Sequence, residues 1–181
     1  MEAGVFLALN ESTPPSLVAE TAKAIEERGF HAVWAPEHVV LFEDYESKYP
    51  YSEDGRIGGF GKGMMEPFAA LTFLAAHTST VRLGTAICLV SQRNPVYTAK
   101  QVADLDFLSG GRVNFGIGLG WLREEFEALQ MPFEKRGQRA NEHIAVMKSL
   151  WCDETSSYDG ELYKLPETVM YPKPVQTPHP P

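Results

Sequence analysis

Three glycines at alternate positions, Gly116, Gly118 and Gly120, have the spacing in this chain that points most directly to chemistry. They lie in the segment 112–126, RVNFGIGLGWLREEF, where an apolar strand leads at once into an acidic helix start. Glycines in such a strand let bare backbone approach a bulky group, and the amide groups of a helix N-terminus can receive an anion. The pattern favours the beginning of a cofactor site.

Two alternative roles compete for the same glycines. The dinucleotide fingerprint needs a third glycine three positions after the second, and Trp121 or Arg123 stands there instead, so that motif is excluded. Close packing between neighbouring strands would also require glycines here. The residues alone leave the cofactor and the packing interpretations open.

Glu37 and His38 form a second candidate, because they come shortly after the apolar segment 31–35. A histidine that titrates near neutral pH beside a carboxylate can hold or relay a proton. His38 can equally cap the end of a strand or hydrogen-bond a neighbour, and spacing does not decide between these roles. The other histidines show no metal-ligand spacing, so no metal is expected.

The composition predicts a single globular domain over residues 1–181. Hydrophobic residues make up 44% of the chain and charged residues 22%, which is enough for one sizeable core. A formal net charge of -8 argues against nucleic acid and anionic membranes as partners. Cys88 and Cys152 are expected to be free thiols. The N-terminal segment lacks a basic region and its apolar run is short, so we expect a cytoplasmic protein without a signal peptide or membrane span.

Apolar segments alternate with segments of helical periodicity along the first two thirds of the chain. The predicted strands are 4–9, 31–35, 81–90 and 112–118, and the predicted helices between them are 14–28, 67–77 and 95–109. This alternation predicts an α/β protein with a parallel sheet and right-handed crossovers. An open doubly wound sheet and part of a (βα)8 barrel both fit the pattern.

Three regions interrupt the alternation. Residues 39–66 form a long loop after a strand end, where barrel enzymes build their sites, and we interpret it as a lid. Residues 121–171 are predicted to be a helical and hairpin insertion, with helices at 124–129 and 138–151 and an Asp-Gly hairpin at 157–163. Residues 172–181 are rich in proline and are expected to be extended.

Four ordered motifs resemble the luciferase-like monooxygenase family, and are most similar to the members that use the deazaflavin coenzyme F420. The motifs are VWAPEH, VRLGTAICLV, the segment 94–151 that begins NPVYTAKQ, and the segment 158–181 that begins YDGELYKL. Together they cover nearly the whole chain. Their combination and order are far more specific than any one motif.

The resemblance implies a (βα)8 barrel whose coenzyme ring lies across the carboxyl-terminal mouth of the strands. On this basis the chain supplies strands one to four and ends just before strand five, so it is expected to be half a barrel. The family's main phosphate-binding loops come from the second half, in keeping with the general barrel pattern. The chain is therefore expected to be either a shortened product or a short homologue that completes its site by another route.

The resemblance also implies the catalytic residues. Glu37 and His38 correspond to an acidic and histidine pair that faces the reactive edge of the ring in F420-dependent members. His38 would hold or relay the proton that accompanies hydride transfer, while the loop 39–66 excludes water.

The cofactor-binding residues are implied in the same way. Ala86 and Ile87 correspond to the place where the family carries a non-prolyl cis peptide that makes a bulge under the ring. The other residues implied to line the cofactor are Leu89, Gly118, Leu119 and Gly120. Glu124 stands where some relatives place an asparagine, and its charge would repel a nearby phosphate.

The resulting functional prediction is an oxidoreductase that transfers a hydride between F420, or alternatively FMN, and a small organic substrate. The alternative is a non-catalytic half-barrel that only self-associates. Four parallel strands leave two open edges and exposed apolar faces, which predicts a homodimer in either case.

Overall fold

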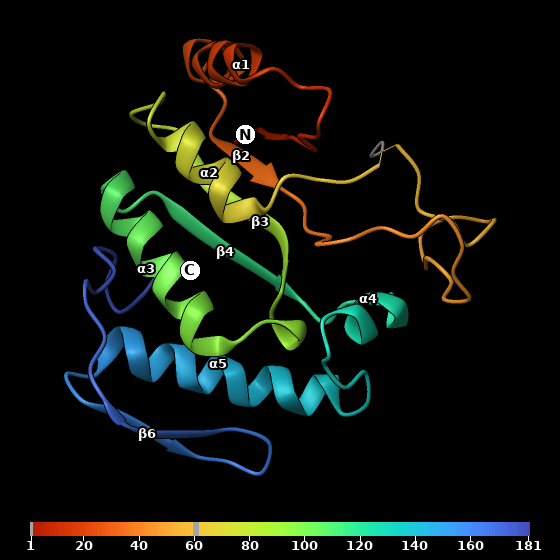
Figure 1. Ribbon diagram of the computed structural model, residues 1–181. Coiled ribbons are helices and arrows are strands. Elements are labelled where there is room, and N and C mark those ends of the chain that lie inside the picture. Colours follow the sequence, from red (N-terminus) through yellow and green to blue (C-terminus); the bar gives the residue numbers. More distant parts are fainter. Residues whose placement is uncertain (1, 60–61) are drawn as a thin grey trace.

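The computed structural model describes residues 2–59 and 62–181, and its centre is one parallel sheet of four strands (Figure 1). The strands lie in the order β1 (Gly4–Phe6), β2 (Ala32–Ala35), β3 (Arg82–Leu89) and β4 (Val113–Gly118). The helices α1 (Pro15–Glu27), α2 (Pro67–Ala75) and α3 (Pro95–Ser109) connect successive strands. A sheet whose spatial order follows the chain order is that of a partial (βα)8 barrel, which confirms the predicted fold class.

The connecting helices form where the sequence supplies start and stop signals. Each of the three begins with a proline, whose fixed φ suits the first helical turn. Asn94 caps α3, because its side chain accepts hydrogen bonds from two amide groups of the first turn, at 3.0 and 3.2 Å. Gly110 ends α3 in the left-handed conformation, with φ 69°.

The two faces of the sheet differ in what covers them. Val33 and Leu83 are almost fully buried in the core that the helices close. Trp34 alternates with Val33 and so lies on the other face, where its indole crosses two neighbouring strands. A Cβ on Gly4 would come within 2.6 Å of the indole nitrogen, and a Cβ on Gly84 would overlap with the six-membered ring. Glycine at both positions is therefore what lets the indole lie flat on the sheet.

The region after β4 contains the predicted helices and hairpin. It consists of α4 (Arg123–Ala128), α5 (Arg136–Cys152), β5 (Ser156–Asp159) and β6 (Lys164–Thr168), and a short 3-10 helix, η1 (Val90–Gln92), follows β3. Figure 1 shows α5 running beneath α3 with the hairpin on its far side. Trp151 fixes this packing, since its indole N–H donates to the carbonyl of Ala99 at 2.9 Å.

The hairpin and the first strand differ from the prediction. The second hairpin strand, β6, begins only after Tyr163, because the side chain of Glu142 accepts the amides of Leu162 and Tyr163 and holds a four-residue loop. β1 ends at Phe6 rather than at residue 9, because the chain leaves the sheet and the carbonyl of Leu9 accepts instead from the amide of Met65, at 2.8 Å.

The tail 172–181 contains no helix or strand, as predicted, but it is well packed. The buried carboxylate of Asp106 accepts the backbone amides of Val175 and Gln176, at 2.8 and 3.0 Å. Lys173 donates to the carbonyl of Leu150 near the end of α5. The tail thus closes the lower edge of β4 against α3 and α5. Among the described residues, no helix combines the length and apolar character that crossing a membrane requires.

Candidate functional site

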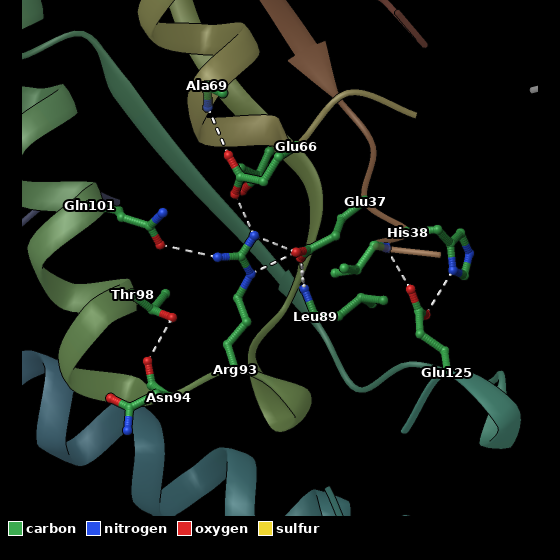
Figure 2. Close-up of polar contacts among 12 residues, drawn as sticks. Glu37, His38, Glu66, Ala69, Leu89, Arg93, Asn94, Thr98, Gln101 and Glu125 are labelled. Atoms are coloured by element: carbon green, nitrogen blue, oxygen red, sulfur yellow. Dashed lines mark hydrogen bonds and ion pairs between the residues drawn. The ribbon is translucent and has the colours of Figure 1, made fainter. Parts of the chain in front are cut away.

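The carboxyl ends of the four parallel strands meet at one edge of the sheet, and Glu37 and His38 lie there just after β2. Both are buried, with 4% and 8% of their surface exposed. Figure 2 shows that the two neighbouring side chains point in opposite directions and engage different partners. The structure brings them to one site but not into contact with the same groups.

Glu37 is bound into a buried network between β2, β3 and α3. Its carboxylate accepts the backbone amide of Leu89 at 2.6 Å and Nε of Arg93 at 2.6 Å (Figure 2). Arg93 also donates to Glu66, at the N-terminus of α2, and to Gln101 of α3. Glu37 therefore holds the end of β3 in place. Every oxygen of its carboxylate is occupied by a group of the protein.

The charges of this network reinforce one another. Burial by itself lowers the pKa of Arg93, but the carboxylate of Glu37 and the hydrogen bonds to Glu37 and Glu66 outweigh burial and raise the pKa above its ordinary value. Cys88 is fully buried beside this pair, and burial, together with the charge of Glu37, raises the pKa of its thiol well above the usual value. Cys88 is thus an uncharged, inert thiol.

His38 is held by Glu125, a residue of α4 that lies 87 positions away. Nδ1 of His38 and Oε2 of Glu125 are 2.9 Å apart, and Glu125 is 1% exposed. The indole of Trp121 meets the imidazole edge-on, with ring centroids 5.8 Å apart and an interplanar angle of 80°. No hydrogen bond to a described residue involves Nε2 of His38. Of the two ring nitrogens, Nε2 is therefore the one that can exchange a proton with a bound molecule.

The glycines of β4 pack closely against β3. The peptide between Ala86 and Ile87 is cis, as the resemblance implied, and the β3–β4 register shifts there. A Cβ on Gly118 would overlap with the side chain of Ile87, and a Cβ on Gly116 would overlap with the carbonyl of Thr85. These two glycines therefore permit close strand packing, the second interpretation that the sequence left open.

Gly120 has a different reason to be glycine. Its φ is 78°, a conformation that other residues rarely adopt, and a Cβ there would come within 2.8 Å of the ring of Phe126. Between these glycines Leu119 remains 44% exposed, and Ile87 is exposed to the same extent. Leu89 is buried, and its amide donates to Glu37. The predicted lining therefore consists of two exposed side chains over a tightly packed support.

These features fit the ring of a flavin or deazaflavin, which has apolar faces and a polar edge. Ile87 and Leu119 offer exposed apolar surface toward the carboxyl ends of β3 and β4, and His38 offers one free ring nitrogen at the same edge of the sheet. A phosphate group fits less well, because the first turn of α4 carries two acidic residues, Glu124 and Glu125. No group of three or more His, Cys, Asp or Glu residues in the described ranges could hold a metal ion.

The loop 39–66 is fastened to α4 beside this site. The rings of Tyr45 and Tyr49 pack on Trp121, with centroids 5.7 and 5.2 Å away. Glu124 accepts the backbone amides of Glu46 and Ser47 at 2.7 and 3.1 Å. Burial raises the pKa of this carboxyl, but the hydrogen bonds from the loop outweigh burial and lower the pKa to about 2. Glu124 is thus a tether for the loop. Residues 60–61 lie outside the described ranges.

The fold is part of an α/β barrel with a buried polar site at its strand ends, and comparison with known proteins identifies the family. The luciferase-like monooxygenase family model matches residues 1–181, and the chain belongs to that family. An uncharacterized protein of Mycobacterium tuberculosis is 34% identical over 89% of this chain and 57% of its own length. An FMNH2-dependent dimethylsulfone monooxygenase of Pseudomonas putida is 30% identical over 74% of this chain and 38% of its own length.

Solved structures give the same picture. The monooxygenase RslO1 of Streptomyces bottropensis superimposes with a TM-score of 0.79 at 27% identity, over 99% of this chain and 52% of that chain. The F420-dependent tetrahydromethanopterin reductase of Methanopyrus kandleri shares the fold, with a TM-score of 0.71 at 23% identity over 97% and 47%. The chain spans about half the length of the proteins it matches.

Proposed function

We propose that this chain is the part of a flavin- or deazaflavin-dependent oxidoreductase that seats the coenzyme ring and handles the accompanying proton. The proposed reaction is hydride transfer between F420 and a small organic substrate, and the coenzyme supplies the redox chemistry when it is bound. The observation that carries the proposal is the buried His38, whose Nε2 makes no hydrogen bond to a described residue and which lies at the same edge of the sheet as the exposed side chains of Ile87 and Leu119.

Each residue of the site has a defined task in this proposal. Nε2 of His38 receives or returns the proton, which is general acid–base chemistry. Ile87 and Leu119 contact a ring face, and Ala86, Leu89, Gly118 and Gly120 shape the backbone beneath them. Glu37 acts on the reaction through the end of β3, since Arg93 and the Leu89 amide occupy its carboxylate. The loop 39–66 excludes water from the ring.

The choice between F420 and FMN rests on two supports of different kinds. A proton-handling histidine suits hydride exchange with a deazaflavin, and the shared fold includes an F420-dependent reductase. FMN is the alternative coenzyme, because a relative at 30% identity is FMNH2-dependent. Both coenzymes present a planar tricyclic ring, so the same apolar surface serves either.

Tryptophan fluorescence tests the proposal directly. The chain has three tryptophans, and Trp121 contacts His38. We expect saturable quenching at micromolar concentrations on titration with F420, and weaker quenching with FMN. The variant Trp121→Phe serves as the control, because it should lose most of the quenching and keep the fold. The absence of quenching by both coenzymes would contradict the proposed function.

A second candidate function is a non-catalytic half-barrel that self-associates. The strand order supports it, because β1 is an edge of the sheet in the described chain, and an unpaired edge favours association. The tail covers part of the other edge, since the amide of Phe115 in β4 donates to the carbonyl of Pro181. We propose a homodimer in both cases. Sedimentation velocity tests this point: a dimer without coenzyme binding would favour the second function, and a monomer at micromolar concentration would contradict the dimer.

A further inference from the structure

Glu125 divides its two carboxylate oxygens between His38 and the first residues of the loop 39–66. Oε2 lies 2.9 Å from Nδ1 of His38, while Oε1 accepts the backbone amide of Val39 at 2.6 Å and that of Val40 at 3.4 Å. The side chain of Glu125 is 1% exposed, so water does not compete for these bonds. One buried carboxylate therefore joins the proton-handling residue to the loop.

The chemistry of these partners fixes where the hydrogen of the neutral imidazole lies. A carboxylate has only acceptor sites, and a neutral imidazole carries a hydrogen on one ring nitrogen and a lone pair on the other. Because Nδ1 faces an acceptor, Nδ1 must carry the hydrogen, and Nε2 is left with its lone pair. Glu37 does not compete for this nitrogen, because its carboxylate is engaged by Arg93.

We infer that Glu125 is a positioning residue that holds His38 in the Nδ1–H tautomer and couples that tautomer to the start of the loop 39–66. The inference rests on the proposed function only for its catalytic meaning: Nε2 is then ready to receive a proton rather than to donate one. A displacement of Val39 moves the same carboxylate that orients His38. The position of the first loop residues and the orientation of His38 are therefore coupled through Glu125.

The adjacent glutamate provides a matched control for this inference. Glu124 is on the same helix and also accepts amides of the loop, from Glu46 and Ser47, but it does not contact His38. The substitution Glu124→Gln changes a charge and a loop contact at this end of α4. It leaves the partner of His38 unchanged.

The substitution Glu125→Gln tests the inference, because a glutamine has one acceptor and one donor where the glutamate has two acceptors. The backbone N–H of Val39 needs an acceptor, so the side-chain oxygen of the glutamine stays at that position. The NH2 group of the glutamine then faces Nδ1 of His38. Nδ1 must then present its lone pair, and the hydrogen moves to Nε2. The expected result is an exchange of the major tautomer.

The measurement is a long-range 15N–1H correlation spectrum of the histidine side chains in the labelled 181-residue chain, recorded above the pH range in which imidazole titrates. The variant His38→Gln identifies the signals of His38 among the five histidines. We expect Nδ1–H in the wild-type chain and in Glu124→Gln, and predominantly Nε2–H in Glu125→Gln.

Two results would overturn the inference: an Nε2–H tautomer in the wild-type chain, or an unchanged tautomer in a folded Glu125→Gln variant. Should that variant not fold, the wild-type spectrum alone decides. The measurement needs no coenzyme, so its outcome is independent of the titrations with F420 and FMN. Coenzyme binding with the wrong tautomer would remove the role of Glu125 and leave the proposed function standing.

Discussion

Glu37 and His38 are consecutive residues at one strand end, yet they belong to two different kinds of polar site. Glu37 faces Arg93 and a backbone amide, and its network joins β2, β3, α2 and α3 with each acceptor oxygen occupied. His38 faces Glu125 through one nitrogen and leaves the other free. The alternation of side chains along extended backbone separates the two.

This difference shows how a strand end can carry both support and chemistry. A network whose donors and acceptors are all paired is rigid, and it loses stability when one member is removed. A site that keeps one group unpaired gives up some stability and gains reactivity. Substitutions on the Glu37 side should therefore affect folding, and substitutions at His38 should affect the reaction.

Removal of Arg93 should give the largest loss of stability. The variant Arg93→Ala leaves the carboxylate of Glu37, which is 0% exposed, without its partner. We expect the free energy of unfolding to fall by about 3–5 kcal/mol, measured by urea denaturation. The double variant with Glu37→Gln should recover part of this loss, because the fully buried carboxylate is then uncharged and only the partly exposed Glu66 has lost its partner. A loss comparable to that of the exposed pair Arg56–Asp44, below about 1 kcal/mol, would contradict the buried network.

Substitution of His38 should give the largest effect on the reaction. In a form of the protein that binds F420, we expect His38→Ala to lower turnover by about 10²- to 10⁴-fold, as for loss of a general acid or base. The absorbance of the coenzyme measures the rate. His31→Ala is the control, because this residue lies before β2 at the opposite end of the strand. Unaltered turnover in His38→Ala would remove the catalytic role.

Acid should release the loop only at very low pH. The pKa of Glu124 is lowered to about 2 in the folded chain from an ordinary value of 4.5. A lowered pKa means that the contribution of Glu124 is complete above pH 4.5 and is lost as the pH falls through about 2. We expect the fluorescence of Trp121 to change in that acid range, and the change to be absent in Glu124→Gln. A change centred near the ordinary glutamate pKa would contradict the tether.

The smallest effect is expected at the cap of α3. Asn94 follows Arg93 directly, so the start of the helix helps to place the guanidinium. The variant Asn94→Ala should lower the free energy of unfolding by about 1 kcal/mol without changing coenzyme binding. Thermal or urea unfolding measures the first effect and fluorescence titration the second. A loss as large as that of Arg93→Ala would show that the cap and the ion pair are one unit.

Most of the fold could be predicted from local sequence signals. Apolar strands, prolines at helix starts and Gly110 after α3 are each sufficient for an element and its approximate ends. The predicted end of β1 was wrong because the carbonyl of Leu9 accepts from the amide of Met65, which is far away in the sequence. The predicted start of the second hairpin strand was wrong because Glu142, in α5, holds the hairpin loop. Local signals contain no information on such partners.

The site was predictable to a different degree at each residue. His38 and the cis peptide before Ile87 were located through the family resemblance, and the glycines through their spacing. Glu125 was missed, since no local pattern joins it to a histidine 87 positions away. Arg93 was missed for the same reason. These pairs form only in the folded chain, where the end of β2 lies beside α4 and beside the start of α3.

The position of Trp34 has a consequence for how this sequence can change over time. Its indole occupies the space above Gly4 and Gly84, on two different strands, and any side chain at either position would collide with it. Gly4 and Gly84 can therefore be replaced only after, or together with, a change at position 34. Lineages that acquire a smaller residue at position 34 are the ones in which alanine or serine becomes permissible at 4 or 84.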